Sequence, residues 1–224
     1  MKLALFDVDG TLVDSRAMIT ASLTASLTAE NLAVPPQKKL LSIVGLSLAD
    51  AMRALVPESD DAQVQRLAAT YKEAFWQFRA SGEHAEDLFR GARELLEELR
   101  TRDDVILGIA TGKSRRGITH LLEAKGMDGW FATIQTSDDH PSKPHPSMVI
   151  QSLSETNTKS SQTIMIGDTT YDIEMARSGG VKAIGVTWGN HQADELARAG
   201  AHILVNDFNE LRDGLASLWQ HEAP

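Results

Sequence analysis

Hydrophobic and polar positions divide the chain into two regions of different periodicity. Between about residues 14 and 85, apolar residues recur at helical spacing in three stretches, 15–31, 38–56 and 60–79, and Gly45 interrupts the second of them. No strand-like alternation occurs in this region. The pattern therefore predicts an all-helical unit that is inserted close to the start of the chain.

Outside this insertion, the pattern alternates between helices and short apolar strands. Such alternation is typical of right-handed βαβ crossovers in a parallel sheet. Three segments, 3–6, 105–110 and 163–166, are apolar throughout, which is typical of interior strands covered on both faces. The spacing predicts further strands at 132–135, 183–186 and 202–205, and helices at 92–100, 114–125, 146–155, 171–178, 192–199 and 208–219.

The predicted fold class is therefore α/β, a Rossmann-like doubly wound parallel sheet with an all-helical cap. We expect residues 1–13 and 86–224 to form the core and residues 14–85 to form the cap. The length of 224 residues suits one large domain with a smaller one inserted into it.

Composition and charge narrow the class of protein. A net charge of −9 and the absence of a long Lys/Arg cluster argue against nucleic acid as a partner. The chain has no cysteine, which excludes disulfides and is compatible with a reducing compartment. No segment looks like a signal peptide or reaches the roughly 18 apolar residues of a membrane span. We therefore expect a cytoplasmic protein without a membrane partner.

Polar residues follow each of the three strongest strands at its carboxyl end. In parallel α/β sheets these ends meet at one crevice, where reactive groups are placed. Two carboxylates one residue apart cannot both enter a hydrophobic core, so the first pair is expected to face a cation or a substrate. The residues concerned are Asp7 and Asp9 after the first strand, Thr111, Gly112 and Lys113 after the second, Asp168 and Asp172 after the third, and Lys143 between the last two.

The carboxylates in this set fit a magnesium site. Asp7, Asp9 and Asp168 offer the hard oxygen ligands that Mg²⁺ prefers. Taken singly, Asp168 could instead be an acid that caps a helix. Asp172 lies one helical turn beyond Asp168, where it would orient Lys143 or a metal-bound water, or simply belong to the first turn of a helix.

The remaining residues fit a phosphate site. Thr111 and the amides around Gly112 open a helix, where N–H groups and the helix dipole favour a phosphate. Lys143 supplies a positive charge for the transferring oxygens. Taken singly, Thr111 could be only a helix N-cap, and Lys143 could be a lysine of a surface loop. The whole set indicates phosphoryl transfer.

With these motifs, the chain resembles hydrolases of the haloacid dehalogenase superfamily, in the branch with a helical cap after the first strand. The resemblance covers nearly the whole length. It implies that Asp7 is the nucleophile that forms an aspartyl-phosphate, and that Asp9 protonates the leaving group and then activates water. It also implies a metal held by Asp7, the backbone carbonyl of Asp9 and Asp168, with Asp172 as an auxiliary acid.

Within the superfamily, the sequence from Phe6 to Ser15 and the Ala-Thr-Gly-Lys segment are most similar to the phosphoglycolate phosphatase group. The expected activity is Mg²⁺-dependent hydrolysis of a small phosphorylated metabolite, by a monomer or a homodimer. We expect Gly45, Ser47 and Arg53, in the second cap stretch, to contribute to substrate choice. Arg53 would equally fit a solvated helix position.

Other functions share parts of this pattern. A sugar-phosphate mutase or a pyrophosphatase of the same fold is an alternative, and Thr11 after Gly10 favours hydrolysis over the mutase reaction. A carbon–halogen hydrolase has no use for Mg²⁺ or for Asp9. A phospho-accepting signalling receiver shares the acidic crevice, but it would be much shorter and would lack the helical insertion.

Overall fold

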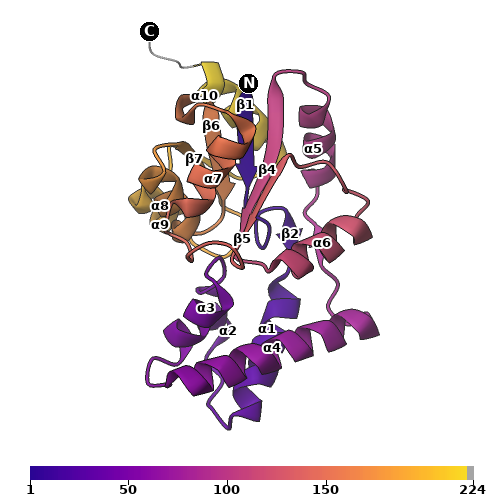
Figure 1. Ribbon diagram of the computed structural model, residues 1–224, viewed down its shortest axis with the longest axis vertical. Coiled ribbons are helices and arrows are strands. Elements are labelled where there is room, and N and C mark those ends of the chain that lie inside the picture. Colours follow the sequence, from indigo (N-terminus) through magenta and orange to yellow (C-terminus); the bar gives the residue numbers. More distant parts are fainter. Residues whose placement is uncertain (221–224) are drawn as a thin grey trace.

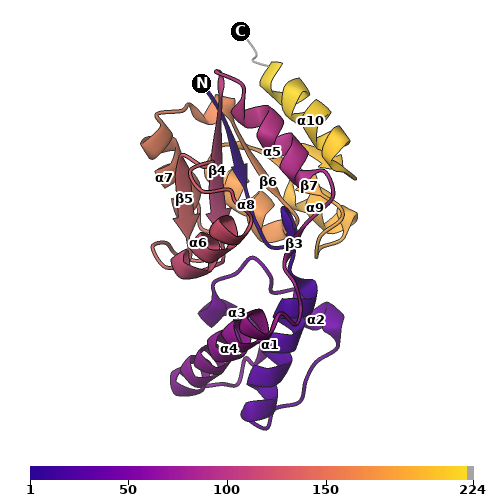
Figure 2. The ribbon, with the colours of Figure 1, turned by 90° about the vertical axis from the view of Figure 1, so that its right-hand side faces the viewer.

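A computed structural model describes residues 1–220 of the chain. Within these residues, a six-stranded parallel sheet is covered by helices on both faces, and four further helices lie over the carboxyl ends of its strands (Figures 1 and 2). None of the helices in this part of the chain combines the length and the apolarity that a membrane crossing requires.

The sheet has the strand order β5-β4-β1-β6-β7-β8. The three strands predicted to be interior, β4, β1 and β6, are neighbours at its centre, so their carboxyl ends lie side by side. This arrangement confirms the predicted α/β class. The strands are β1 (Lys2–Phe6), β4 (Val105–Thr111), β5 (Thr133–Thr136), β6 (Thr163–Gly167), β7 (Lys182–Val186) and β8 (Ile203–Val205).

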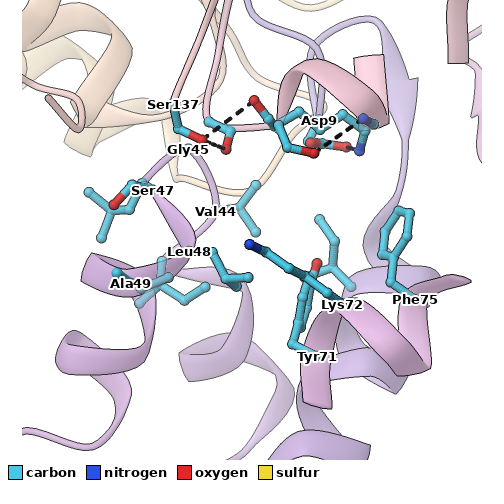
Figure 3. A pocket seen from close by; sticks show the side chains of 18 of the residues that line it. Asp9, Val44, Gly45, Ser47, Leu48, Ala49, Tyr71, Lys72, Phe75 and Ser137 are labelled. Carbon is cyan, nitrogen blue, oxygen red and sulfur yellow. Dashed lines mark hydrogen bonds and ion pairs between the residues drawn. The ribbon is translucent and has the colours of Figure 1, made fainter. Parts of the chain in front are cut away.

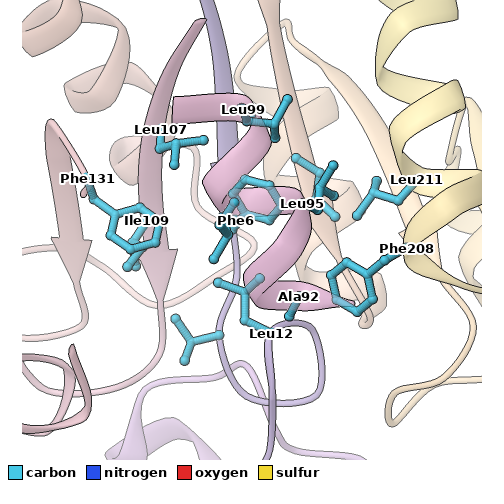
Figure 4. Packing of buried hydrophobic residues seen from close by; sticks show 14 of the residues in the cluster. Phe6, Leu12, Ala92, Leu95, Leu99, Leu107, Ile109, Phe131, Phe208 and Leu211 are labelled. Carbon is cyan, nitrogen blue, oxygen red and sulfur yellow. The ribbon is translucent and has the colours of Figure 1, made fainter. Parts of the chain in front are cut away.

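Alternate residues of the central strand point into two different cores. Ala4 and Phe6 of β1 pack in the first core (Figure 4), and Leu3 and Leu5 pack in the second. Burial on both faces explains why this strand is apolar throughout. The helices are α5 (Ala92–Arg100), α6 (Arg115–Ala124) and α10 (Phe208–Gln220) over the first core, and α7 (Ser147–Thr156), α8 (Thr170–Ser178) and α9 (Ala193–Ala199) over the second, with a 3-10 turn, η1 (Ser160–Gln162), before β6.

The four cap helices share a third apolar cluster of their own, which includes Leu23, Met52 and Leu67. The single helical stretch predicted over 38–56 is two helices in the structure. Gly45 has a φ of 100°, a left-handed conformation that ends helical geometry between them. The helices are α1 (Arg16–Ala29), α2 (Gln37–Leu41), α3 (Leu48–Leu55) and α4 (Asp61–Ser81).

A short antiparallel ribbon joins the cap to the core. In this ribbon, β2 (Val13–Asp14) pairs with β3 (Asp87–Leu88). The sequence pattern predicted no strand here and placed Asp14 in the helical cap, because a two-residue strand is too short to produce a period. Both crossings between cap and core therefore run side by side.

Substitution of a buried and of an exposed isoleucine should affect the free energy of unfolding differently. Ile166 of β6 is 0% exposed, whereas Ile150 of α7 is 55% exposed. Ile166→Ala should lower the free energy of unfolding by about 2–5 kcal/mol, because it leaves a cavity in the first core. Ile150→Ala should change it by about 0.5 kcal/mol or less. Denaturation of both variants in urea checks this, and equal losses would contradict the packing described.

Candidate active site

A cavity of about 300 Å³ lies between the cap and the carboxyl ends of the central strands (Figure 3). Asp7, Asp9, Gly112 and Lys113 line its core side. The cap side is mostly apolar and aromatic, and it is formed in part by Ile19, Leu23, Val44, Leu48, Tyr71, Phe75 and Trp76. The structure therefore places the first sequence motif at the floor of this cavity.

Lys143 links two of the predicted carboxylates. Its ammonium donates to Asp7 Oδ1 at 2.7 Å and to Asp172 Oδ1 at 2.6 Å. None of the three side chains is more than 1% exposed, so Lys143 is not a lysine of a surface loop. Burial acts to lower the pKa of Lys143, but the two carboxylates outweigh it and raise that pKa above its usual range. Lys143 therefore remains charged, and Asp172 orients it.

Asp168 lies beside this group, and both of its oxygens accept hydrogen bonds. The Thr11 hydroxyl donates to Oδ1 at 2.9 Å, while the backbone and side-chain amides of Asn190 donate to Oδ2 at 2.8 and 2.9 Å. Burial, with a contribution from Asp172, raises the pKa of Asp168 to about 7. A Cβ on Gly10 would lie 2.3 Å from Asp168 Oδ2, so only glycine fits there. Asn190 belongs to no sequence motif and was therefore not predicted.

The carboxylates of Asp7, Asp168 and Asp172 form a group that could hold a metal ion, with one oxygen of each within 4.8 Å of the others. Two observations fit Mg²⁺. The ammonium of Lys143 pairs with only two of these three buried carboxylates, Asp7 and Asp172, among the described residues, and Asp7 Oδ2 is buried there without a hydrogen-bond partner. Burial is the main cause that raises the pKa of Asp7, and the nearby acids Asp172 and Asp168 raise it further. A bound cation would counteract this rise in pKa.

The carboxylate of Asp9 has a different partner, although only one residue separates it from Asp7. Lys113 Nζ donates to Asp9 Oδ1 at 2.6 Å and also lies 3.0 Å from Glu86 Oε1. Burial acts to lower the pKa of Lys113, but Asp9 and Glu86 outweigh it and raise that pKa. Glu86 was not predicted, because it lies in the linker before β3 and outside any motif.

Thr111 ends β4 and is fully buried at the edge of the site. It does not cap the following helix, since the Ser114 side chain accepts the capping hydrogen bond from the Gly117 amide at 3.2 Å. The Thr111 hydroxyl instead accepts from the Lys113 amide at 3.1 Å. A Cβ on the next residue, Gly112, would lie 2.6 Å from a cap carbonyl oxygen. The cap backbone thus lies directly against the core at this predicted phosphate-binding segment.

Two of the three cap residues predicted to influence substrate choice line the cavity, namely Gly45 and Ser47. The Ser47 backbone amide donates a hydrogen bond to Ser142 Oγ of the core at 2.8 Å. The structure places Arg53 outside the cavity, at the solvated helix position that was its alternative. Its guanidinium pairs with Asp61 at 2.8 Å, its side chain is 51% exposed, and it does not line the cavity, because it lies on the solvent-facing side of α3.

Lys72 also lines the cavity, although no sequence motif predicts it. Its side chain points from α4 into the cavity (Figure 3). No other residue in the described part of the chain forms a hydrogen bond or an ion pair with its ammonium. It lies among apolar and aromatic side chains such as Val44 and Tyr71. A free ammonium in such surroundings can bind an anionic group of a ligand.

This fold and site define a hydrolase of the haloacid dehalogenase-like class. Residues 4–186 match the family model described as haloacid dehalogenase-like hydrolase, and the matched segment contains every site residue predicted above. The chain therefore belongs to this family.

Similar proteins match over nearly the whole chain. It is 33% identical to "Probable phosphatase IndB" of Dickeya dadantii, over 93% of this chain and 91% of that one. It is 28% identical to "Pyrophosphatase PpaX" of Oceanobacillus iheyensis, over 92% and 93%, and 25% identical to "Phosphoglycolate phosphatase" of Pectobacterium atrosepticum, over 92% and 88%. The crystal structure of a predicted phosphatase from Clostridium acetobutylicum superposes with a TM-score of 0.86 at 29% identity, over 96% and 98%. The chain is thus a phosphatase-like hydrolase of this family.

The raised pKa of Asp168 predicts how the stability of the metal-free protein depends on pH. The folded state has a pKa of about 7 at this group, and an unfolded aspartate has one of about 4. Between these values the folded state holds more protons, so the free energy of unfolding should fall as the pH rises through this window. Asp168→Asn should reduce that fall.

Urea denaturation in chelator, at intervals between about pH 4 and pH 8, measures this difference. Added Mg²⁺ should stabilise the wild-type protein at the upper end of the range and have a much smaller effect on Asp168→Asn. An identical pH dependence in both proteins would contradict the burial of an ionisable Asp168.

Proposed function

We propose that the protein is a Mg²⁺-dependent phosphatase that hydrolyses a small phosphorylated metabolite through an aspartyl-phosphate. The arrangement of Asp7 carries the proposal. Its carboxylate lies at the floor of the cavity, with one oxygen fixed by Lys143 and the other without a partner among the described residues. A carboxylate held in this way is suited to attack phosphorus.

The surrounding residues supply the other functions that this reaction needs. Asp9 donates a proton to the leaving oxygen and later takes one from the water that hydrolyses the aspartyl-phosphate. Lys143 and the amides around Gly112 face the charge that develops on the phosphoryl oxygens. Asp7, Asp168 and Asp172 would hold Mg²⁺, which supplies charge stabilisation for the phosphoryl group.

The cavity supports a substrate with a second anionic group. Its volume of about 300 Å³ suits a small molecule. The cap presents apolar and aromatic side chains and the unpaired ammonium of Lys72. Phosphoglycolate, with a carboxylate, and pyrophosphate, with a second phosphate, both have the charge that Lys72 would bind. Pyrophosphate hydrolysis is therefore the second candidate activity.

Replacing the nucleophile tests the reaction itself. Asp7→Asn should lower phosphate release by about a thousandfold or more, because an amide cannot form the phosphorylated intermediate. The assay measures release from phosphoglycolate, sugar phosphates and pyrophosphate, with Mg²⁺ and with chelator. Asp194→Asn removes a carboxylate on exposed α9 and serves as the matched control. Activity of Asp7→Asn close to that of the control would rule out the proposed role of Asp7.

Replacing Lys72 tests the substrate class. Lys72→Met should raise KM for phosphoglycolate and pyrophosphate by roughly tenfold, because each loses a hydrogen bond to a charged group. KM for ethyl phosphate, which has no second anionic group, should change little. Lys38→Met, at an exposed position on α2, is the control. The assignment fails if KM rises equally for all three substrates.

A further inference from the structure

An ion-pair network of four side chains connects Asp9 to the cap. Lys113 Nζ pairs with Asp9 at 2.6 Å and with Glu86 Oε1 at 3.0 Å, and Glu86 pairs with Arg79 through Oε2. Asp9 and Lys113 belong to the core, Arg79 lies on cap helix α4, and Glu86 lies in the linker between them. The side chains of Asp9, Lys113 and Glu86 are 11%, 8% and 5% exposed.

An aromatic ring of the cap contacts both cations of this ion-pair network. The ring of Phe75 lies 5.3 Å from Lys113 Nζ and 5.0 Å from the Arg79 guanidinium. Cations are attracted to the face of such a ring, most strongly where water is excluded. Lys113 therefore contacts the cap through Phe75 as well as the linker through Glu86, so its position depends on where the cap lies.

The position of the Asp9 carboxylate depends in turn on Lys113. Among residues 1–220, Lys113 is the side chain that forms a hydrogen bond with the Asp9 carboxylate. A lysine side chain has a flexible four-carbon stem, so by itself it is a poor support for another group. Glu86 and Phe75 restrict that stem, and Arg79 restricts Glu86. The carboxylate of Asp9 is thus held by contacts that begin in the cap.

We propose that Lys113 and Glu86 are positioning residues, which hold the Asp9 carboxylate in place for proton transfer when the cap lies against the core. Neither residue contacts the phosphoryl group in this role. The inference rests on the proposed function, since it takes Asp9 to be the group that protonates the leaving oxygen.

Substrates with different leaving groups test this role. An alkyl phosphate leaves as a strongly basic alkoxide that requires a proton, whereas p-nitrophenyl phosphate leaves as a weakly basic phenolate that requires little assistance. Lys113→Met and Glu86→Gln should lower kcat/KM for ethyl phosphate by roughly tenfold or more, and that for p-nitrophenyl phosphate much less. Lys113→Arg should retain most activity, because a guanidinium can still bridge the two carboxylates.

Two further variants complete the design. Glu98→Gln removes a surface carboxylate that pairs with Arg212 at 2.7 Å, and it should leave both rates unchanged. Asp9→Asn is the reference for loss of proton transfer. It should lower kcat/KM for ethyl phosphate relative to p-nitrophenyl phosphate even more strongly than the positioning variants do. Thermal denaturation identifies any variant that does not fold. If Lys113→Met does not fold, the rates of Glu86→Gln alone test the positioning role.

The possible failures are distinguishable. If Asp9→Asn lowers the rates with both substrates equally, the proton-transfer role of Asp9 is wrong and the positioning role falls with it. If Asp9→Asn shows the dependence, but Glu86→Gln lowers both rates equally or changes neither, Asp9 keeps its role and the positioning proposal is overturned. The ion-pair network would then only stabilise the junction of cap and core.

Discussion

The ion pairs of Lys143 are the interaction on which the site depends. They join Asp7, at the end of β1, to a lysine 136 residues away and to Asp172 on α8. Carboxylates so deeply buried would be costly without a compensating cation, and removing a single partner from such a group is strongly destabilising. The central position of β1 between β4 and β6 makes the compensation possible, because it brings these distant segments to one edge of the sheet.

The same edge gives two neighbouring carboxylates different surroundings. Asp7 pairs with the buried ammonium of Lys143 and belongs to the carboxylate group that would hold a metal. Asp9 instead pairs with Lys113, which links it to the cap. In the proposed reaction, Asp7 must remain ionised and Asp9 must exchange protons, so the two carboxylates need different environments. The structure separates them by assigning each its own lysine, one in the core and one at the junction with the cap.

The sequence was most informative where chemistry follows directly from strand position. The apolar strands predicted the parallel sheet. The polar residues near their carboxyl ends then predicted that Asp7, Lys143 and Asp168 would lie close together. The ribbon of β2 and β3 could not be predicted, because each strand has only two residues. The roles of Glu86 and Lys72, and the exposure of Arg53, depend on which face of a helix or linker meets the core, and helical period alone does not specify that face.

The geometry of α4 connects substrate contact with the support of Asp9. Lys72, Phe75 and Arg79 are separated by three and four residues, so they lie along one face of this helix. Lys72 points into the cavity, Phe75 contacts both cations of the ion-pair network, and Arg79 is a member of that network. A helix behaves as one rigid element, so in the proposed reaction a substrate held by Lys72 would also fix Phe75 against Lys113. The two proposals therefore predict that binding of the leaving group and placement of Asp9 are coupled through one cap helix.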